Sequence, residues 1–151
     1  MSDSEATEAV LRALLTTQQL AVLATREEDG QPYANLMAFA ASDDLKTLLL
    51  VTGRATRKYE NLRADPRVAL LIDSRSHEPS DIHQAVAVTV LGEVEEVSDS
   101  ERDRLLPAYL AKHPHLEHFA SSPSSAMFQV HVRSYYLVRR FQAVTELHVQ
   151  R

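Results

Sequence analysis

Short apolar segments separated by turn signals recur along most of this chain, and they constrain its fold more than any other feature. The first two such segments, Leu20–Arg26 and Tyr33–Ala41, are joined by Glu27-Glu28-Asp29-Gly30 and then Pro32. An Asp-Gly pair is a strong hairpin signal because glycine tolerates the positive φ that tight turns require. The sequence therefore predicts an antiparallel hairpin at the start of the β region.

Four further segments have the character of strands. Thr47–Thr52 is rich in leucine, which predicts burial on both faces. Ala85–Val97 alternates valines with small residues, and Gly92 within it permits a bend or a bulge. The remaining two are Arg67–Asp73 and Met127–Phe141. An antiparallel sheet of about six strands with short turns has to close or cover its edges, so we expect a small barrel.

Three helices are expected at the edges of this sheet. The first is capped by Ser4, the second covers Ala55–Ala64, and the third starts behind the capping box Ser98-x-x-Glu101. Pro107 should kink or split the third helix, because proline lacks a backbone donor and clashes with the preceding turn. The polar stretch Arg75–Gln84 is interpreted as a loop.

Composition narrows the class of protein. The chain has 151 residues, from which we expect a single domain over residues 1–151. Its formal net charge of -5 argues against a nucleic-acid partner, since nucleic-acid binders carry a basic surplus. No apolar run is long enough to span a membrane, and the absence of cysteine excludes disulfides and thiolate metal sites. We expect a cytoplasmic protein without a membrane partner.

The segment Val51–Lys58 is the best candidate for a functional site. A strand ends there, a glycine turns the chain and a helix begins, so unpaired backbone N–H groups lie beside Arg57 and Lys58. Two cations on a first helical turn oppose the helix dipole, so helix stability does not explain them. An anion held by these cations and by the hydroxyls of Thr52 and Thr56 explains them. A solvated basic face with ordinary ion pairs is the alternative interpretation.

Three motifs also occur in a characteristic order, and together they cover roughly Leu20 to Val97. They are Leu20-Ala21-Val22-Leu23-Ala24-Thr25 with Gly30-Gln31-Pro32-Tyr33; Thr52 with Thr56-Arg57-Lys58, Asn61-Leu62 and Asp65-Pro66-Arg67-Val68-Ala69-Leu70-Leu71; and Val90-Leu91-Gly92-Glu93-Val94-Glu95. This order resembles the flavin-binding split-barrel superfamily typified by pyridoxamine 5′-phosphate oxidase. The resemblance implies a six-stranded antiparallel split β-barrel of the Greek-key type. It also implies a homodimer with FMN at the interface.

The resemblance further implies which residues hold the cofactor. The implied set is Asn35, Met37, Val51, Thr52, Thr56, Arg57 and Lys58. Among these, Thr52, Arg57 and Lys58 match positions that bind the FMN phosphate, and Met37 lies on the strand beside the flavin ring. Asn35 and Ala40 stand where the oxidase has an arginine and a lysine, and Arg139-Arg140-Phe141-Gln142 replaces its Arg-x-His motif. These departures argue against oxidation of pyridoxamine phosphate itself.

Two classes of function follow from the resemblance. The first is an FMN-dependent oxidoreductase that acts on a small-molecule substrate or electron donor. In such an enzyme the cofactor carries the chemistry, so no catalytic residue is named. The second is a non-enzymatic flavin- or haem-binding protein that serves as a sensor, a carrier or a haem-utilisation protein. A cofactor-free dimeric module is a third class. A deazaflavin offers the same kind of phosphate as FMN, so the residues do not separate these two cofactors.

A histidine cluster offers another candidate site. His115 and His118 have the i,i+3 spacing that can ligate a metal or serve a haem, and His113 lies nearby. Pro114 and the polar surroundings instead favour a solvent-exposed patch, so we expect no metal site. Three arginines on the last strand are interpreted as edge charges that discourage aggregation rather than as interface groups: Arg133, Arg139 and Arg140.

Overall fold

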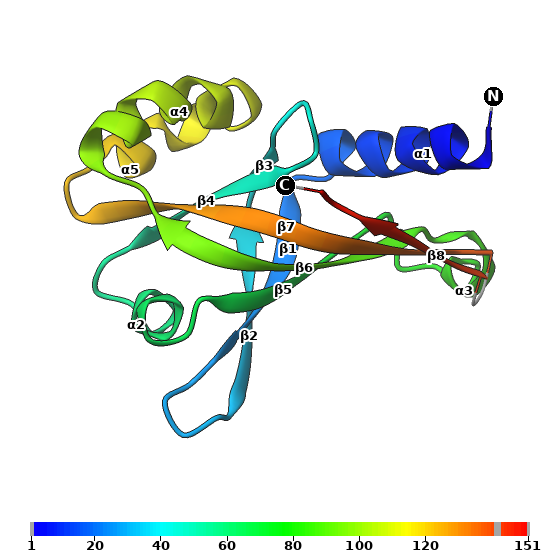
Figure 1. The fold of residues 1–151 in the computed structure, drawn as a ribbon, viewed down its shortest axis with the longest axis horizontal. Coiled ribbons are helices and arrows are strands. Elements are labelled where there is room, and N and C mark those ends of the chain that lie inside the picture. Colours follow the sequence, from blue (N-terminus) through cyan, green and yellow to red (C-terminus); the bar gives the residue numbers. More distant parts are fainter. Residues whose placement is uncertain (1, 141–142, 151) are drawn as a thin grey trace.

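The computed structural model describes residues 2–140 and 143–150, and its strands form one curled antiparallel sheet (Figure 1). The strands are β1 (Leu20–Arg26), β2 (Pro32–Ala38), β3 (Ala40–Ala41), β4 (Thr47–Gly53), β5 (Arg67–Asp73), β6 (Ala87–Glu96), β7 (Ser125–Arg139) and β8 (Ala143–His148). The helices are α1 (Asp3–Thr17), α2 (Arg57–Ala64), α3 (Asp81–Gln84), α4 (Asp99–Lys112), α5 (Glu117–Ser121) and the 3-10 turn η1 (Pro114–Leu116). Within these residues, no helix is both long enough and apolar enough to cross a membrane.

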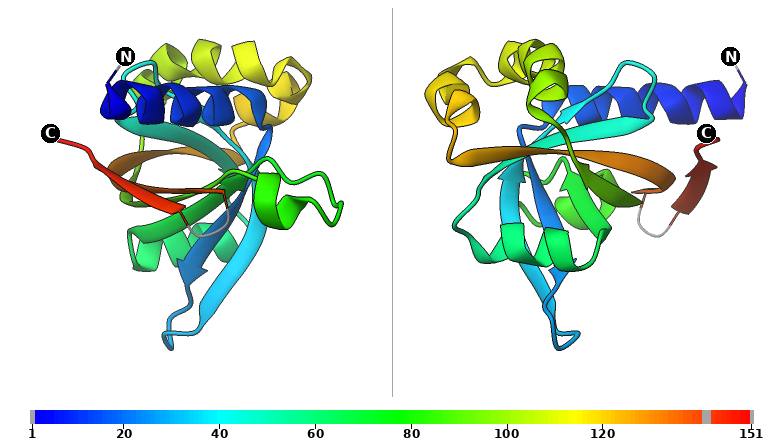
Figure 2. Two further views of the ribbon diagram at one scale, coloured as in Figure 1. Left: turned by 90° about the vertical axis from the view of Figure 1, so that its right-hand side faces the viewer. Right: turned by 60° about the vertical axis from the view of Figure 1, so that its left-hand side comes forward.

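The sheet closes because a single residue joins its two ends. The strand order is β2-β1-β5-β6-β7-β4-β3, and β8 pairs with β7 off this path. β2 and β3 stand at opposite ends of that order, yet only Phe39 separates them in the chain. The sheet must therefore curl until its ends meet, and Figure 2 shows the result from two further sides. The predicted mainly β split barrel with peripheral helices is confirmed.

The strand count exceeds the predicted six for two reasons. The predicted strand Tyr33–Ala41 is divided at Phe39 into β2 and β3, and β8 adds a strand along β7. β8 is short and mostly exposed, so its sequence carries no clear strand signal. β1 and β5 have the predicted bounds, and the register of β6 against β7 shifts at Gly92, where a bulge was predicted. The predicted end of the last strand at Phe141 lies outside the described residues.

The starts of α1 and α2 differ from the predictions. Ser2 caps α1 by accepting a hydrogen bond from a backbone N–H one turn later, so the prediction of Ser4 as cap is wrong. α2 begins at Arg57 rather than at Ala55, because Thr56 has extended backbone angles and caps the helix with its side chain. Both caps lie where a hydroxyl meets the first free N–H groups of a helix.

α4 runs unbroken through Pro107, so the predicted split at this proline is wrong. Ser98 caps this helix as predicted, since its hydroxyl accepts a hydrogen bond from the N–H of Glu101, whereas the Glu101 carboxylate accepts from Arg104 instead of closing a capping box. Arg102 and Tyr109 are buried on either side of the proline, and this packing outweighs the hydrogen bond that proline removes. The predicted loop between β5 and β6 holds one short helical turn, α3.

Two hydrophobic cores hold the helices to the barrel. The larger core fills the barrel and takes in Leu11, Leu14 and Leu15 from α1. The smaller core packs α4 and α5 against β3, β4 and β7, with Tyr109 and Met127 among its buried residues. β4 contributes to both cores, so it is buried on both faces as predicted.

The C-terminal end of α4 is fastened to the point where the sheet closes. His113 is 1% exposed, and its Nε2–H donates a hydrogen bond to the Phe39 carbonyl at 2.7 Å. The Lys112 ammonium lies 3.7 Å from the centroid of the Phe39 ring and donates to the Leu15 carbonyl at 2.8 Å. His113 is therefore part of the fold, and its assignment to a solvent-exposed patch is wrong. His115 and His118 are exposed.

The half-buried Lys112 should make stability depend on pH. Burial lowers the pKa of Lys112 from 10.5 to about 8 in the folded protein. Between these values the unfolded chain binds more protons, so the stability contributed at Lys112 rises with pH. We expect the wild type to gain free energy of unfolding relative to Lys112→Met as the pH rises from 8 to 10.5. Urea denaturation of both proteins across this range checks the expectation, and a constant difference would contradict it.

Candidate functional site

α2 lies beside the β1–β2 hairpin (Figure 1), and its first residue, Arg57, contacts Glu27 directly after β1. Arg57 Nη1 donates a hydrogen bond to Glu27 Oε1 at 2.9 Å, and this ion pair raises the pKa of Arg57. The Arg57 guanidinium also lies 6.0 Å from the centroid of the Tyr33 ring. The hairpin and the helix, which are separate in the sequence, thus meet at Arg57.

The two threonines of the predicted site are brought together, and the fold uses both hydroxyls. Thr52 Oγ1 and Thr56 Oγ1 are 3.2 Å apart, and Thr52 is fully buried. Thr56 Oγ1 also donates to the Gly53 carbonyl at 2.9 Å and accepts from the Tyr59 N–H at 3.2 Å. These bonds set the turn from β4 into α2. The threonines therefore position the first turn of the helix.

Lys58 is the cation that the fold leaves uncompensated at this turn. Within the described residues, no carboxylate lies within ion-pair distance of its ammonium, whereas the neighbouring Arg54 pairs with Glu96 at 2.8 Å. Arg57 and Lys58 occupy the first two positions of α2, where backbone N–H groups have no acceptor inside the helix. This arrangement is suited to an anion.

Asn35 carries an unsatisfied buried group close to the same place. Side chains alternate along a strand, so Asn35 shares one face of β2 with Tyr33, which lies under Arg57. Its Oδ1 is buried, and it has no hydrogen-bond partner among the residues that the structure describes. Its Nδ2 donates only to the adjacent Leu36 carbonyl, at 3.3 Å. A ligand that donates a hydrogen bond here would satisfy this oxygen.

Met37 and Val51 lie on the strands of the site, but their side chains face the interior. Met37 belongs to the barrel core and Val51 to the smaller core. In the part of the chain that is described, β2 pairs only with β1, and β3 pairs with β4 only at Leu48 and Leu49. The facing edges of β2 and of the end of β4 thus keep backbone groups available. Met37 and Val51 can contribute through their main chain.

The charge around Arg57 is mainly negative. A depression of about 340 Å³ beside it is lined by Glu27, Glu28, Asp29, Arg57, Glu60 and Asn61. An anion that binds Arg57 therefore has to compete with the Glu27 carboxylate for this guanidinium. Neither Glu27 nor Tyr33 was among the predicted site residues. The acidic run of the hairpin was visible, but its contact with a helix 30 residues later was not.

The histidine cluster has no arrangement suited to a metal. Within the described residues, no group of three or more His, Cys, Asp or Glu side chains lies close enough to hold a metal ion. His113 faces the Phe39 carbonyl, and its ring is 6.2 Å from that of His115.

Comparison with known proteins identifies the family. A family model described as pyridoxamine 5′-phosphate oxidase matches residues 7–139. Pyridoxine/pyridoxamine 5′-phosphate oxidases of Cupriavidus taiwanensis and Cupriavidus necator are each 38% identical to this chain over 92 residues. That match covers 61% of this chain and only 38% of each relative, less than two thirds of its length.

Solved structures share the fold at low sequence identity. A haem-binding protein from Mycobacterium smegmatis is 20% identical, with a TM-score of 0.84 over 98% of this chain and 59% of that one. An FAD-binding protein from Mesorhizobium loti is 23% identical, with a TM-score of 0.66 over 91% of this chain and 94% of that one. The fold and the family match agree over most of the described residues. The chain belongs to the pyridoxamine 5′-phosphate oxidase family.

Proposed function

We propose that this protein is an FMN-binding oxidoreductase of the cytoplasm, with a small-molecule substrate or electron donor. The observation that carries the proposal is the buried Oδ1 of Asn35, which has no partner among the described residues, two residues from the Tyr33 ring that Arg57 contacts at the start of a helix. The family match and the flavin named for the Mesorhizobium loti structure support a flavin as the ligand. The haem named for the Mycobacterium smegmatis structure supports the alternative of a non-enzymatic haem-binding protein.

The residues present fit a flavin mononucleotide. At the start of α2, Lys58 and the first backbone N–H groups have no anionic partner among the described residues, and Arg57 is paired with Glu27. The phosphate of FMN supplies a negative charge to all of these groups, in competition with Glu27 at Arg57. Its ribityl hydroxyls are donors of the kind that Asn35 Oδ1 requires. The backbone edges at Met37 and Val51 can hydrogen-bond the polar rim of the ring. Thr52 and Thr56 set the position of the helix start.

The flavin, when bound, supplies the transfer of a hydride or of single electrons. The chain supplies the phosphate anchor, the orientation of the ring and the exclusion of water. No side chain in the proposed site is assigned an acid or base role. NAD(P)H-dependent reduction of the bound flavin favours the enzyme over a carrier, and a deazaflavin is separated from FMN by its absorption spectrum.

Removing the two cations should abolish tight flavin binding. The double variant Arg57→Ala with Lys58→Ala loses both charges on the phosphate, and we expect FMN affinity to fall roughly a hundredfold or more. Quenching of flavin fluorescence during titration measures the affinity. Arg63→Ala, at the other end of α2, serves as the matched control and should bind FMN like the wild type. Unchanged affinity in the double variant would refute the proposed phosphate site.

The Glu27 carboxylate should compete with the phosphate for Arg57. Glu27→Gln removes the competing charge at an exposed ion pair, so we expect FMN to bind about two- to fivefold more tightly. The same titration measures this change. Glu28→Gln, on the same hairpin, controls for a general change of charge. Weaker binding by the Glu27 variant would show that the carboxylate assists the ligand instead.

We propose a homodimer that covers the outer apolar patch, defined as Leu20, Val22, Leu36 and Leu71. Val22 faces Leu36 on one side and Leu71 on the other, and the three leucines are 51%, 63% and 40% exposed in chain order. Side chains fill the barrel, so a flavin has to lie outside it, where a second subunit is the simplest cover.

Charge placed in this patch should separate the subunits. We expect the double variant Leu36→Glu with Leu71→Glu to be monomeric, because two carboxylates would be buried without partners in the interface. Light scattering coupled to size-exclusion chromatography measures the mass in solution. Ile82→Glu, which changes an exposed apolar residue of α3, is the control and should leave the dimer intact. A wild-type monomer at micromolar concentration would overturn the proposed interface.

A further inference from the structure

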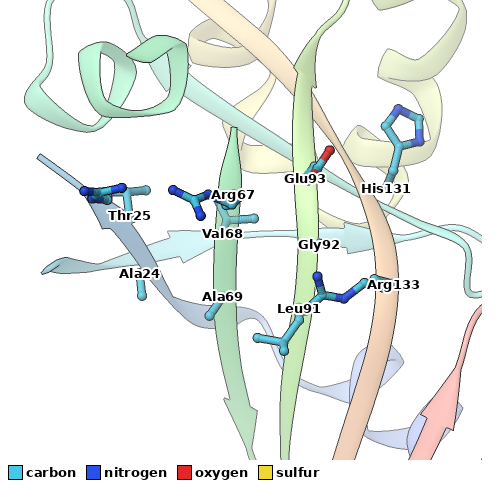
Figure 3. A pocket seen from close by; sticks show the side chains of 11 residues that line it. Ala24, Thr25, Arg67, Val68, Ala69, Leu91, Gly92, Glu93, His131 and Arg133 are labelled. Atoms are coloured by element: carbon cyan, nitrogen blue, oxygen red, sulfur yellow. The ribbon is translucent and has the colours of Figure 1, made fainter. Parts of the chain in front are cut away.

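A second candidate site opens on the outer face of the sheet, across β1, β5, β6 and β7 (Figure 3). The pocket has a volume of about 300 Å³, at the small end of the range for ligand sites. Its lining is Ala24, Thr25, Arg26, Arg67, Val68, Ala69, Leu91, Gly92, Glu93, His131 and Arg133. It shares no lining residue with the proposed flavin site.

A bulge in the sheet shapes this pocket. Leu91 pairs with Ser134 and Gly92 with Val132, so Arg133 has no residue opposite it in the ladder. A Cβ on Gly92 would lie 2.4 Å from the His131 carbonyl oxygen, so only glycine fits here. Bulges often redirect a side chain beside a functional site. Figure 3 shows the Arg133 side chain reaching from β7 toward β6, beside Leu91 and Gly92.

The other arginines are fixed by a shared carboxylate. Asp65 Oδ1 accepts from Arg67 Nε at 3.0 Å, and Asp65 Oδ2 accepts from Arg67 Nη2 at 2.7 Å and from Arg26 Nη1 at 3.4 Å. This pairing holds the pKa of Asp65 well below its usual range. Glu93 stands opposite Arg67 in the ladder. At the pocket, the carboxylates of Asp65 and Glu93 therefore stand against three guanidinium groups. These belong to Arg26, Arg67 and Arg133.

Arg133 is the member of this group that lacks a counter-charge. Among the described residues, no carboxylate lies within ion-pair distance of its guanidinium, while His131 faces Glu95 at 3.7 Å. The protein as a whole carries a formal net charge of -5, and this pocket is one of the places where a cation lacks a carboxylate partner among the described residues. A planar guanidinium is suited to a carboxylate or a phosphate.

The floor beneath these charges is apolar. Ala24, Ala69 and Leu91 come from three adjacent strands and lie across the ladder from one another. Small side chains and the missing Cβ of Gly92 leave room for a flat group against the sheet. We propose that this pocket binds a small organic anion, with its carboxylate or phosphate on Arg133 and its flat apolar part on this floor.

Calorimetric titration of the whole protein tests this site. The probes are AMP and benzoate, which separate phosphate from carboxylate recognition, with adenosine and inorganic phosphate to test whether both halves of the ligand are needed. We expect AMP or benzoate to bind, adenosine and phosphate to bind more weakly, and Arg133→Gln to weaken binding about tenfold. Arg104→Gln, an exposed arginine of α4, is the matched control and should bind like the wild type.

Two further measurements distinguish this pocket from the proposed flavin site and from a contact with a second copy of the chain. The Arg57→Ala, Lys58→Ala variant should bind the probe as the wild type does, because the pocket is separate from the proposed flavin site. Loss of probe binding in that variant, or unchanged binding in Arg133→Gln, would overturn the proposal. It would also be overturned if Arg133→Gln bound no probe and became monomeric, since the pocket would then receive an acidic side chain of a second copy. FMN titration reports separately on the flavin site.

Discussion

The closure of the sheet at Phe39 is the constraint on which the rest of the structure depends. One residue links strands at opposite ends of the sheet order, so the chain can be accommodated only if the sheet curls. The buried His113 ring holds the Phe39 carbonyl, and Lys112 lies over the Phe39 ring while it bonds the end of α1. The link at Phe39 is thus the point where the closed sheet is held to both α4 and α1. The closure also brings β2, which carries Asn35, close to β4, the strand that leads into α2.

Ion pairs are a second feature that recurs over the surface of the molecule. Most exposed cations are paired: Arg54 with Glu96, Arg57 with Glu27, and Arg67 with Asp65. Surface pairs of this kind add little to stability, so their main effect here is to neutralise cations on an acidic protein. Lys58 and Arg133 are among the cations that pair with no carboxylate in the described fold. Each lies beside a structural feature that permits close approach of a ligand, a helix start in one case and a glycine bulge in the other.

Membership of the pyridoxamine 5′-phosphate oxidase family determines the fold. The chemistry depends on which residues this chain places in the site. Asn35 replaces a cation that the resemblance leads one to expect, and its buried Oδ1 has no described partner. This exchange favours a neutral hydrogen bond to the ligand over a charged one. The main positive charge is then left to α2, where Glu27 moderates it. Under the proposed function, flavin affinity is therefore governed by few groups and is sensitive to each of them.

The sequence by itself determined the local features. Turn residues, β-type patterns and a capping box predicted β1, β5, the bulge at Gly92 and the start of α4, because each depends on neighbours within a few residues. Only the tertiary structure decided where His113, Glu27 and Arg133 lie and what surrounds them. His113 meets a carbonyl 74 residues away, and Glu27 meets a guanidinium 30 residues away. Such contacts arise when the barrel closes and buries apolar surface, and no local pattern encodes which polar groups then face each other.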